Sequence, residues 1–403
     1  MGRVLSKSKT IIELEDKINQ GNREALQAFW DKLKDKGTPI IENIEGDSEN
    51  ALVTFVFKAD EEVENVVFMP PVGRMNFLEN KMERLLKTNL WHASYKIKND
   101  IRFSYFFSVN DSLDPNSTER WDKLENDQFN KNKLVYKGKN GEWDKIDSYA
   151  IMPKAEEHFW VKERSNTLKG TLHEYEFQSK NFKDGRRIRI YTPHDYKKQD
   201  KPYKVLTLTD GDEYINILST VQVLDNLISD EKIPPIVAIF IDSTETRGEE
   251  LRCNDIFGDV VVKELIPWVR ERYNISNKAE DAIIGGFSLG GLTATYLGLK
   301  HSEVFGNVLS QSGSYWYKAE GYEGTEMDCW LSTEFKSIDK LPLKFYLNVG
   351  VLEHEERMIG TNIKLRDALI SKGYTVNFEY FNSGHDCLSW GETLANGLIS
   401  LIG

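Results

Sequence analysis

The chain contains few cysteines and no long apolar run. Among its 403 residues there are only three cysteines, Cys253, Cys329 and Cys387, which form no C-x-x-C motif and cannot all pair. This usage is typical of a reducing compartment and indicates no metal site. No segment approaches the ~18 consecutive apolar residues of a membrane span, and the first residues lack the apolar core of a secretion signal. We therefore expect a cytoplasmic protein with no membrane partner, no metal and no cofactor.

Basic residues are outnumbered. The chain has 52 Lys and Arg against 64 Asp and Glu, which gives a net charge of −12 at pH 7. Binding to a nucleic acid needs a clustered basic surface, and no such cluster is visible in the sequence. We therefore exclude a nucleic-acid partner. An anionic substrate would, for the same reason, need positive charge placed locally at its site.

The hydrophobic period changes along the chain. Residues 11–36 have apolar positions at helical spacing and stop at Gly37-Thr38-Pro39, which predicts one or two helices. Short alternating segments separated by polar turns then predict a small β-sandwich. These segments are residues 51–57, 66–69, 91–97 and 102–108. We expect residues 1–155 to form an N-terminal domain of this kind.

Strand and helix patterns alternate in the second half, beyond a charged boundary at residues 153–167. This alternation predicts a mostly parallel sheet between two helical layers, so we expect an α/β domain with a doubly wound sheet over residues 165–403. The predicted strands are residues 187–193, 203–209, 236–241, 282–284, 308–312, 345–349 and 376–381, and the predicted helices include residues 217–228, 260–273 and 362–372.

The most informative motif is Gly286-Phe287-Ser288-Leu289-Gly290, between a strand pattern and a helix pattern. It is typical of a nucleophile elbow, the strand-to-helix turn that holds a serine in a strained conformation with its hydroxyl exposed. Gly286 and Gly290 leave room for the strand and the helix to pass closely. We therefore predict that Ser288 is the nucleophile of an α/β-hydrolase.

A serine nucleophile needs a base and a carboxylate that orients the base. His385 follows the last predicted strand, where the base would reach the carboxyl edge of the sheet, and Glu353 follows the preceding strand. We predict these two as base and acid, in the chain order typical of α/β-hydrolases. Asp328 and Asp386 are alternative acids, and a Ser-His pair without a strict third member is a further alternative.

The oxyanion of an acyl-transfer intermediate needs two N–H donors. The residue after the nucleophile, Leu289, supplies one, and Gly211, in the turn after residues 203–209, is placed to supply the other. A plain turn before a helix, capped by Asp212, is an alternative reading of the same residues.

Several of these motifs together resemble the enterochelin (ferric enterobactin) esterase family. The resemblance covers most of residues 165–403 and reaches the β-rich region before them. It rests on Asp210-Gly211 with Tyr214, Ile241-Asp242-Ser243 leading to Arg247, Glu250-Leu251, Cys253-Asn254, the elbow, and Gly384-His385-Asp386 with Trp390.

The resemblance implies an immunoglobulin-like N-terminal domain and a serine esterase with Ser288, His385 and Glu353 as its triad. It implies hydrolysis of a catecholate siderophore trilactone, of the enterobactin or bacillibactin type, through an acyl-enzyme, so that bound iron is released. Because the ferric form of such a substrate is anionic, we expect substrate contacts from local cations and from one amide of the motif. These candidates are Arg247, Arg252, Arg357 and Asn254. For each arginine, a surface ion pair with a nearby glutamate is the alternative.

Two other functions remain open at this point. One is a carboxylic ester hydrolase of the same architecture that acts on an aromatic or acetyl carbohydrate ester, which the missing secretion signal disfavours. The other is a non-catalytic binding protein with the same fold, which the ordered set of Ser288, Glu353 and His385 disfavours. Residues 68–86, with Pro70-Pro71 and Arg74, are either part of the substrate site or a long loop.

Overall fold

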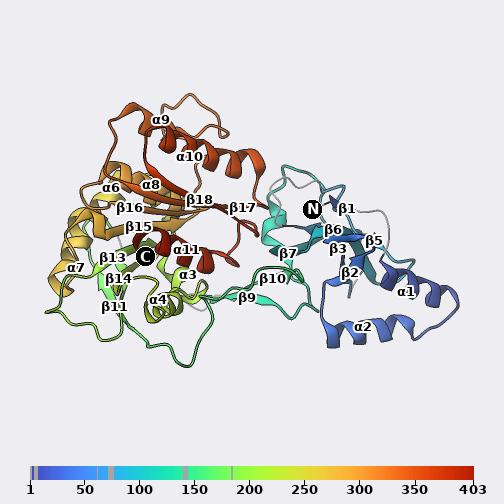
Figure 1. Ribbon diagram of the computed structural model, residues 1–403. Helices are drawn as coiled ribbons and strands as arrows, with labels where there is room; N and C mark the ends of the chain where they lie inside the picture. Colours follow the sequence, from blue (N-terminus) through green and yellow to red (C-terminus); the bar gives the residue numbers. More distant parts are fainter. Residues whose placement is uncertain (1, 4–7, 61, 71–76, 139–143, 183–184) are drawn as a thin grey trace. The chain divides into compact units, whose positions relative to one another are not determined.

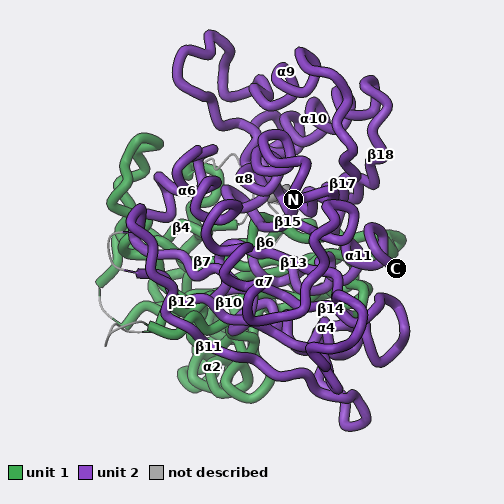
Figure 2. The backbone as a smooth tube through the Cα atoms, turned by 90° about the vertical axis from the view of Figure 1, so that its left-hand side faces the viewer, with its two compact units in different colours: residues 1–157, 382–386 green, residues 158–381, 387–403 purple. Residues whose placement is uncertain are grey.

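The computed structural model describes residues 2–3, 8–60, 62–70, 77–138, 144–182 and 185–403 (Figure 1). Pro71 and Arg74, singled out above, lie outside these residues. The chain forms two compact units, coloured separately in Figure 2: residues 1–157 with 382–386, and residues 158–381 with 387–403. The short segment 382–386 therefore groups with the first unit, although it lies near the end of the sequence.

Two helices follow the short first strand, β1 (Gly2–Arg3), as the helical spacing predicted. α1 (Lys9–Asn19) begins at Ser8, whose hydroxyl accepts a hydrogen bond from the Ile11 N–H at 3.1 Å. α2 (Ala25–Lys36) ends at Gly37, which has a φ of 85°, a conformation that glycine adopts without steric cost. The apolar faces of both helices are buried in a cluster with residues of the neighbouring strands. This cluster includes Ile11, Leu14, Phe29, Trp30, Leu33, Val56, Leu90 and Phe129.

Two antiparallel sheets make up the rest of the first unit. Their elements are β1 (Gly2–Arg3), β2 (Ile40–Ile44), β3 (Asp47–Lys58), β4 (Val66–Met69), β5 (Glu83–Arg84), β6 (Leu90–Lys98), β7 (Arg102–Val109), the 3-10 helix η1 (Glu119–Asp122), β8 (Leu124–Glu125), β9 (Lys133–Tyr136) and β10 (Lys145–Ile151). One sheet has the order β1-β6-β3-β2 with β5 beside β6, and the other β4-β7-β10-β9 with β8 beside β7. The ring centroid of Phe55 on β3 lies 4.0 Å from that of Phe68 on β4 and 4.8 Å from that of Tyr105 on β7. Aromatic packing between the sheets thus confirms the predicted β-sandwich.

One eight-stranded sheet forms the centre of the second unit. Its strands are β11 (Thr171–Phe177), β12 (Arg186–Thr192), β13 (Lys204–Thr209), β14 (Ile236–Ile241), β15 (Ala282–Phe287), β16 (Asn307–Gln311), β17 (Lys344–Gly350) and β18 (Thr375–Phe381). The order is β11-β12-β14-β13-β15-β16-β17-β18. The pairs β11·β12 and β12·β14 are antiparallel, and the others are parallel. Every residue of β14 and β15 is buried, as expected for central strands covered on both faces.

Helices cover both faces of this sheet. They are α3 (Gly211–Asn216), α4 (Thr220–Ser229), α5 (Arg247–Glu250), α6 (Asp255–Asp259), the π-helical η2 (Val260–Leu265), α7 (Ile266–Arg272), the 3-10 helix η3 (Ala279–Asp281), α8 (Leu289–Lys300), α9 (Trp330–Ser337), the π-helical η4 (Glu355–Gly360), α10 (Thr361–Ser371) and α11 (Trp390–Ile402). Apolar residues of α3, α4 and α11 pack in one core cluster, and those of α7, α8, α9 and α10 in another. The doubly wound α/β-hydrolase fold is therefore confirmed.

Some helix boundaries differ from the prediction. The helix expected over residues 260–273 is a run of α6, η2 and α7 that starts at Asp255. Pro267 has no backbone N–H to continue a regular ladder, and the widened π-helical segment ends two residues before it. The helix expected over residues 217–228 is α4, separated from α3 by Ser219, which has a φ of 54°.

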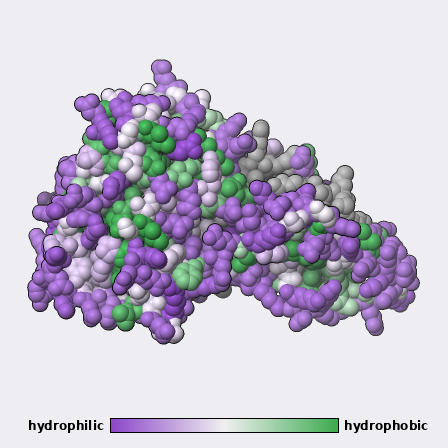
Figure 3. All heavy atoms as spheres, in the orientation of Figure 1, coloured by the Kyte–Doolittle hydropathy of each residue, from purple (hydrophilic) through white to green (hydrophobic). Residues whose placement is uncertain are grey.

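The surface view in Figure 3 is dominated by hydrophilic residues, with hydrophobic ones scattered among them, in keeping with a charged content of 29%. No helix within the described part of the chain is long and apolar enough to cross a membrane.

Candidate active site

Ser288 occupies the turn between β15 and α8. Its backbone has φ 55° and ψ −119°, a region in which a non-glycine residue is strained by about 1–3 kcal/mol and persists only where its surroundings enforce it. Its N–H donates to the Gln311 carbonyl at 2.9 Å, and its own carbonyl accepts from the N–H groups of Leu292 (3.1 Å) and Ser314 (3.0 Å). The side chain is half-buried. The turn therefore has the geometry of a nucleophile elbow.

The glycines of the motif are sterically required. A Cβ atom on Gly286 would lie 2.5 Å from the backbone carbonyl carbon of Gly290, across the turn. A Cβ atom on Gly290 would lie within 2.5 Å of Thr209 Oγ1, at the end of the neighbouring strand β13. The close approach of β15 and α8 thus explains the local sequence, and it was readable from the motif alone.

A second hydroxyl lies beside the candidate nucleophile. Ser314 Oγ is 3.3 Å from Ser288 Oγ, and either atom can be the donor. Ser314 is 1% exposed, so this pairing is held in the interior. Sequence reasoning missed Ser314. Its position just after β16 was the available signal, because β16 runs parallel to β15 and the two strands end at the same edge of the sheet.

Leu289 and Gly211 are both placed at helix starts. Leu289 is the first residue of α8 and Gly211 the first of α3, so their N–H groups belong to the turn that has no intrahelical acceptor. β13 and β15 are parallel neighbours, which brings the turn after β13 to the same sheet edge as the elbow. A Cβ atom on Gly211 would lie 2.8 Å from Asp242 Oδ1, so only glycine fits there.

The two aspartates that flank Gly211 are each held by arginine. Asp210, fully buried, accepts from Arg247 at 2.5 and 2.8 Å. Asp212 accepts from Arg187 at 2.9 Å and from Arg189 at 3.0 Å. Because charged hydrogen bonds fix both neighbours, the backbone of the candidate oxyanion loop is rigid before any substrate binds.

Arg247 therefore forms an ion pair within the protein. The sequence indicates such a pair as the alternative to a substrate contact, but with a nearby glutamate and not with Asp210. Its side chain is 30% exposed and its guanidinium lies 5.8 Å from the Phe287 ring, beside the elbow. Burial acts to lower the pKa of Arg247, but the hydrogen bonds and attraction of Asp210 outweigh it and raise the pKa. The group remains a cation, and its role toward a substrate stays a prediction.

Arg247→Ala is expected to lower the free energy of unfolding by about 3 kcal/mol, because it leaves the buried carboxylate of Asp210 without its cation. Urea denaturation followed by circular dichroism measures this. Arg252→Ala is the matched control, since Arg252 is exposed and forms no ion pair among the residues that the structure describes; it should change stability by no more than about 0.5 kcal/mol. An Arg247→Ala protein of unchanged stability with a raised KM would instead assign this arginine to the substrate.

Glu353 lies in the turn after β17 and is 4% exposed. Its Oε1 atom accepts from the Gly350 N–H at 2.8 Å and from the Ser312 hydroxyl at 2.5 Å. The Ser312 hydroxyl in turn accepts from Trp390 Nε1 at 3.1 Å. This chain fixes the carboxylate, as a residue that orients an imidazole requires.

The two alternative acids are engaged elsewhere. Asp328 lies in a surface turn where the Thr325 N–H, the Lys364 ammonium and the Thr325 hydroxyl lower its pKa to about 2. Asp386 is buried, and its carboxylate accepts from the Ser104 N–H at 3.2 Å and from the Ser383 hydroxyl at 3.1 Å. Both carboxylates stabilise local structure, and Glu353 stays the predicted acid.

His385 is carried by a segment that hydrogen-bonds to β7 of the first unit. The Arg102 N–H donates to the Asn382 carbonyl at 3.1 Å, and the Ser383 hydroxyl donates to the Arg102 carbonyl at 3.0 Å. With the bond from Ser104 to Asp386, the residues on both sides of His385 are fixed to the start of this strand. The β-sandwich therefore positions the loop of the candidate base, which the sequence did not indicate.

The remaining substrate candidates occupy three different settings. Asn254 caps α6, since its side-chain oxygen accepts from the N–H groups of Ile256 (2.9 Å) and Phe257 (3.1 Å). Arg357 stacks on Trp316, with the guanidinium 4.0 Å from the ring centroid, and its Nε is 3.3 Å from a carboxylate oxygen of Glu326. Arg252 is exposed. Their contacts with a substrate stay predictions.

Two family models match the chain. "Putative esterase" matches residues 179–401, and "Enterochelin esterase, N-terminal" matches residues 52–161. The iron(III) enterobactin esterase of Escherichia coli is 30% identical over 350 residues, which cover 81% of this chain and 82% of that protein.

The chain is also similar to solved structures of enterobactin esterases. The ferric enterobactin esterase of Salmonella typhimurium is 26% identical with a TM-score of 0.75, over 93% of this chain and 98% of that one. The enterobactin esterase of Shigella flexneri, crystallised in the presence of enterobactin, is 26% identical with a TM-score of 0.73, over 91% of this chain and 96% of that one.

Proposed function

This chain belongs to the enterochelin esterase family and is a carboxylic ester hydrolase, and we propose that its substrate is a catecholate siderophore trilactone of the enterobactin or bacillibactin type. Hydrolysis opens the trilactone and so releases the bound iron. The observation that carries the proposal is the strained elbow at Ser288, in a chain whose relatives are named for hydrolysis of iron(III) enterobactin.

The proposed reaction is an acyl transfer in two steps. Ser288 Oγ attacks the ester carbonyl while His385 takes its proton, and the N–H groups of Leu289 and Gly211 bind the oxyanion. The intermediate collapses when His385 returns the proton to the leaving alcohol, and an acyl-enzyme remains. Water, deprotonated by His385, then attacks the acyl-enzyme and frees Ser288. Glu353 holds the imidazole in the required orientation throughout.

Arg247, Arg252, Arg357 and Asn254 are the proposed contacts of the substrate. The stacked pair of Arg357 and Trp316 supports part of this proposal, because a cation over an aromatic face suits an aryl group that carries negative charge. Trp316 follows Ser314 by two residues, and Ser314 touches the candidate nucleophile. The pair is therefore tied to the elbow through a short, buried stretch of chain.

We place the reaction in the cytoplasm. None of the three cysteines forms a disulfide, which is typical of a reducing compartment.

Burial raises the pKa of the Cys329 thiol to about 12, so this thiol stays protonated and unreactive at neutral pH.

Turnover of matched substrates tests the proposal. We expect kcat/KM for a trilactone to exceed that for a feruloyl or an acetyl sugar ester by at least about 10²-fold, because the polar groups of a site built for catechols stay unpaired with the other esters. Steady-state assays by liquid chromatography measure all three. Faster hydrolysis of the sugar esters would contradict the proposal and assign the fold to carbohydrate esters instead.

A further inference from the structure

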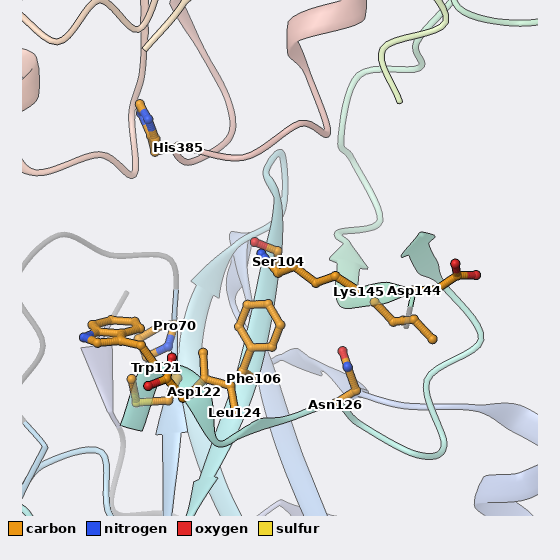
Figure 4. A pocket seen from close by; sticks show the side chains of 12 residues that line it. Pro70, Ser104, Phe106, Trp121, Asp122, Leu124, Asn126, Asp144, Lys145 and His385 are labelled. Atoms are coloured by element: carbon orange, nitrogen blue, oxygen red, sulfur yellow. The ribbon is translucent and has the colours of Figure 1, made fainter. Parts of the chain in front are cut away.

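A cavity of about 650 Å³ lies within the first unit, and His385 forms part of its lining (Figure 4). Apolar and aromatic side chains from β4, β7, η1, β8 and β10 form the other walls. They include Met69, Phe106, Trp121, Leu124 and Ile146. A volume of this size is in the range of small-molecule sites, which span about 300–1,000 Å³.

Two large side chains of the cavity are exposed although they are apolar. Trp121 is 52% exposed and Ile146 is 37% exposed. Single exposed apolar residues are common on surfaces, but here both line one cavity together with the half-buried Phe106. A flat aromatic group is the ligand that such walls fit, because it can stack on the indole and displace water from the isoleucine.

The charges around the cavity do not favour an anion. Asp122, Asp144 and Lys145 line it. Asp144 is paired with Lys137 at 2.6 Å, and Lys145 lies 3.8 Å from Asp147. Among the described lining residues, two carboxylates thus accompany one ammonium group, so this lining offers acceptors for hydroxyl donors and no excess of lysine or arginine. A catechol with both hydroxyls protonated meets this requirement, whereas a ferric tris-catecholate has neither the protons nor the suitable charge.

His385 connects the cavity to the reaction. A general base acts on atoms within about 2.6–3.2 Å of its nitrogen, so the ester being cleaved lies next to His385. A substrate with that ester at His385 can place its aryl arm in the cavity that the same residue lines. We propose that this cavity binds one iron-free catechol arm of the trilactone during cleavage. This inference rests on the proposed function, and it assigns a substrate site to the N-terminal domain.

The test compares two cavity variants, one on η1 and one on β10, with a control on β10. Trp121→Ala and Ile146→Ala remove cavity walls, and Ile151→Ala is the matched control, since Ile151 is also on β10 and 43% exposed but does not line the cavity. The measured quantity is the ratio of kcat/KM for iron-free trilactone to kcat/KM for p-nitrophenyl acetate. We expect this ratio to fall about tenfold in Trp121→Ala, because KM for the trilactone rises, and severalfold in Ile146→Ala. The same ratio for ferric trilactone, and every ratio for Ile151→Ala, should stay within about twofold of wild type.

Unchanged ratios in both cavity variants, or an equal loss in Ile151→Ala, would overturn the inference. A wild-type enzyme that turns over no trilactone would overturn the proposed function instead. The cavity is then tested without catalysis, by calorimetric titration of N-(2,3-dihydroxybenzoyl)serine into Ser288→Ala protein. The double variant Ser288→Ala/Trp121→Ala should bind this compound about tenfold more weakly. Equal binding by the two proteins would contradict the proposal that the cavity binds a catechol arm.

Discussion

Replacement of Ser288 by alanine is expected to lower kcat toward every ester substrate by about 10³-fold or more. The change removes only the hydroxyl. The three hydrogen bonds described above for Ser288 involve its backbone and therefore persist in the variant, which loses the contact of its hydroxyl with Ser314. Thermal unfolding should consequently stay close to that of the wild type, and single-turnover assays with an activated aryl ester measure the loss of chemistry.

Ser314→Ala is the control for this experiment. Ser314 Oγ is the hydroxyl at 3.3 Å from Ser288 Oγ, so its removal tests whether either serine can carry the acyl group. We expect the Ser314→Ala enzyme to form an acyl-enzyme on Ser288 that intact-mass spectrometry detects. A Ser288→Ala enzyme that still hydrolyses esters at the wild-type rate would mean that the mechanism is wrong.

The second large effect is expected for His385→Ala, which should reduce kcat by about 10³-fold, because a serine hydroxyl without a base is a poor nucleophile. Added imidazole should restore part of the activity, since it can enter the space of the missing ring and act as the base. Stopped-flow acylation rates with and without imidazole give the measurement.

His354→Ala serves as the matched control. His354 is next to the candidate acid, but its Nδ1 accepts from the Arg357 N–H at 3.2 Å and caps η4. Its loss should lower stability by about 1 kcal/mol, as the loss of a helix cap does, and leave kcat within a few fold of wild type. Equal losses of kcat in the two variants, or full activity of His385→Ala, would remove His385 from the mechanism.

The parts of the site that depend on local backbone geometry could be predicted from the sequence. A strained serine turn between β15 and α8 needs glycines at fixed offsets, so the motif around Ser288 determines its own conformation. The sheet of the second unit was predictable for a related reason: buried parallel strands are continuous apolar runs, and β14 is one. The edge strand β11 was missed because its alternating Thr171–Phe177 pattern is half polar.

Contacts between residues far apart in the sequence could not be predicted. The charge of Arg247 was visible, but its bidentate pairing with Asp210, 37 residues earlier, depends on how β13 and β14 adjoin. Asp386 looked like an acid beside His385, although its bond to Ser104 joins positions 282 residues apart. The spacing of residues in the sequence does not predict such pairs, because the order of the strands in the folded sheets determines which loops lie next to each other.

The attachment of residues 382–386 to β7 has a consequence for how the two halves of this protein can vary. Arg102 and Ser104 bond to Asn382, Ser383 and Asp386 on both sides of the imidazole. Chimeras that join the front half of one relative to the back half of another would inherit these two stretches from different parents. Shuffling between homologues should therefore transfer residues 102–104 and 382–386 as one unit, even though nearly three hundred positions of sequence lie between them.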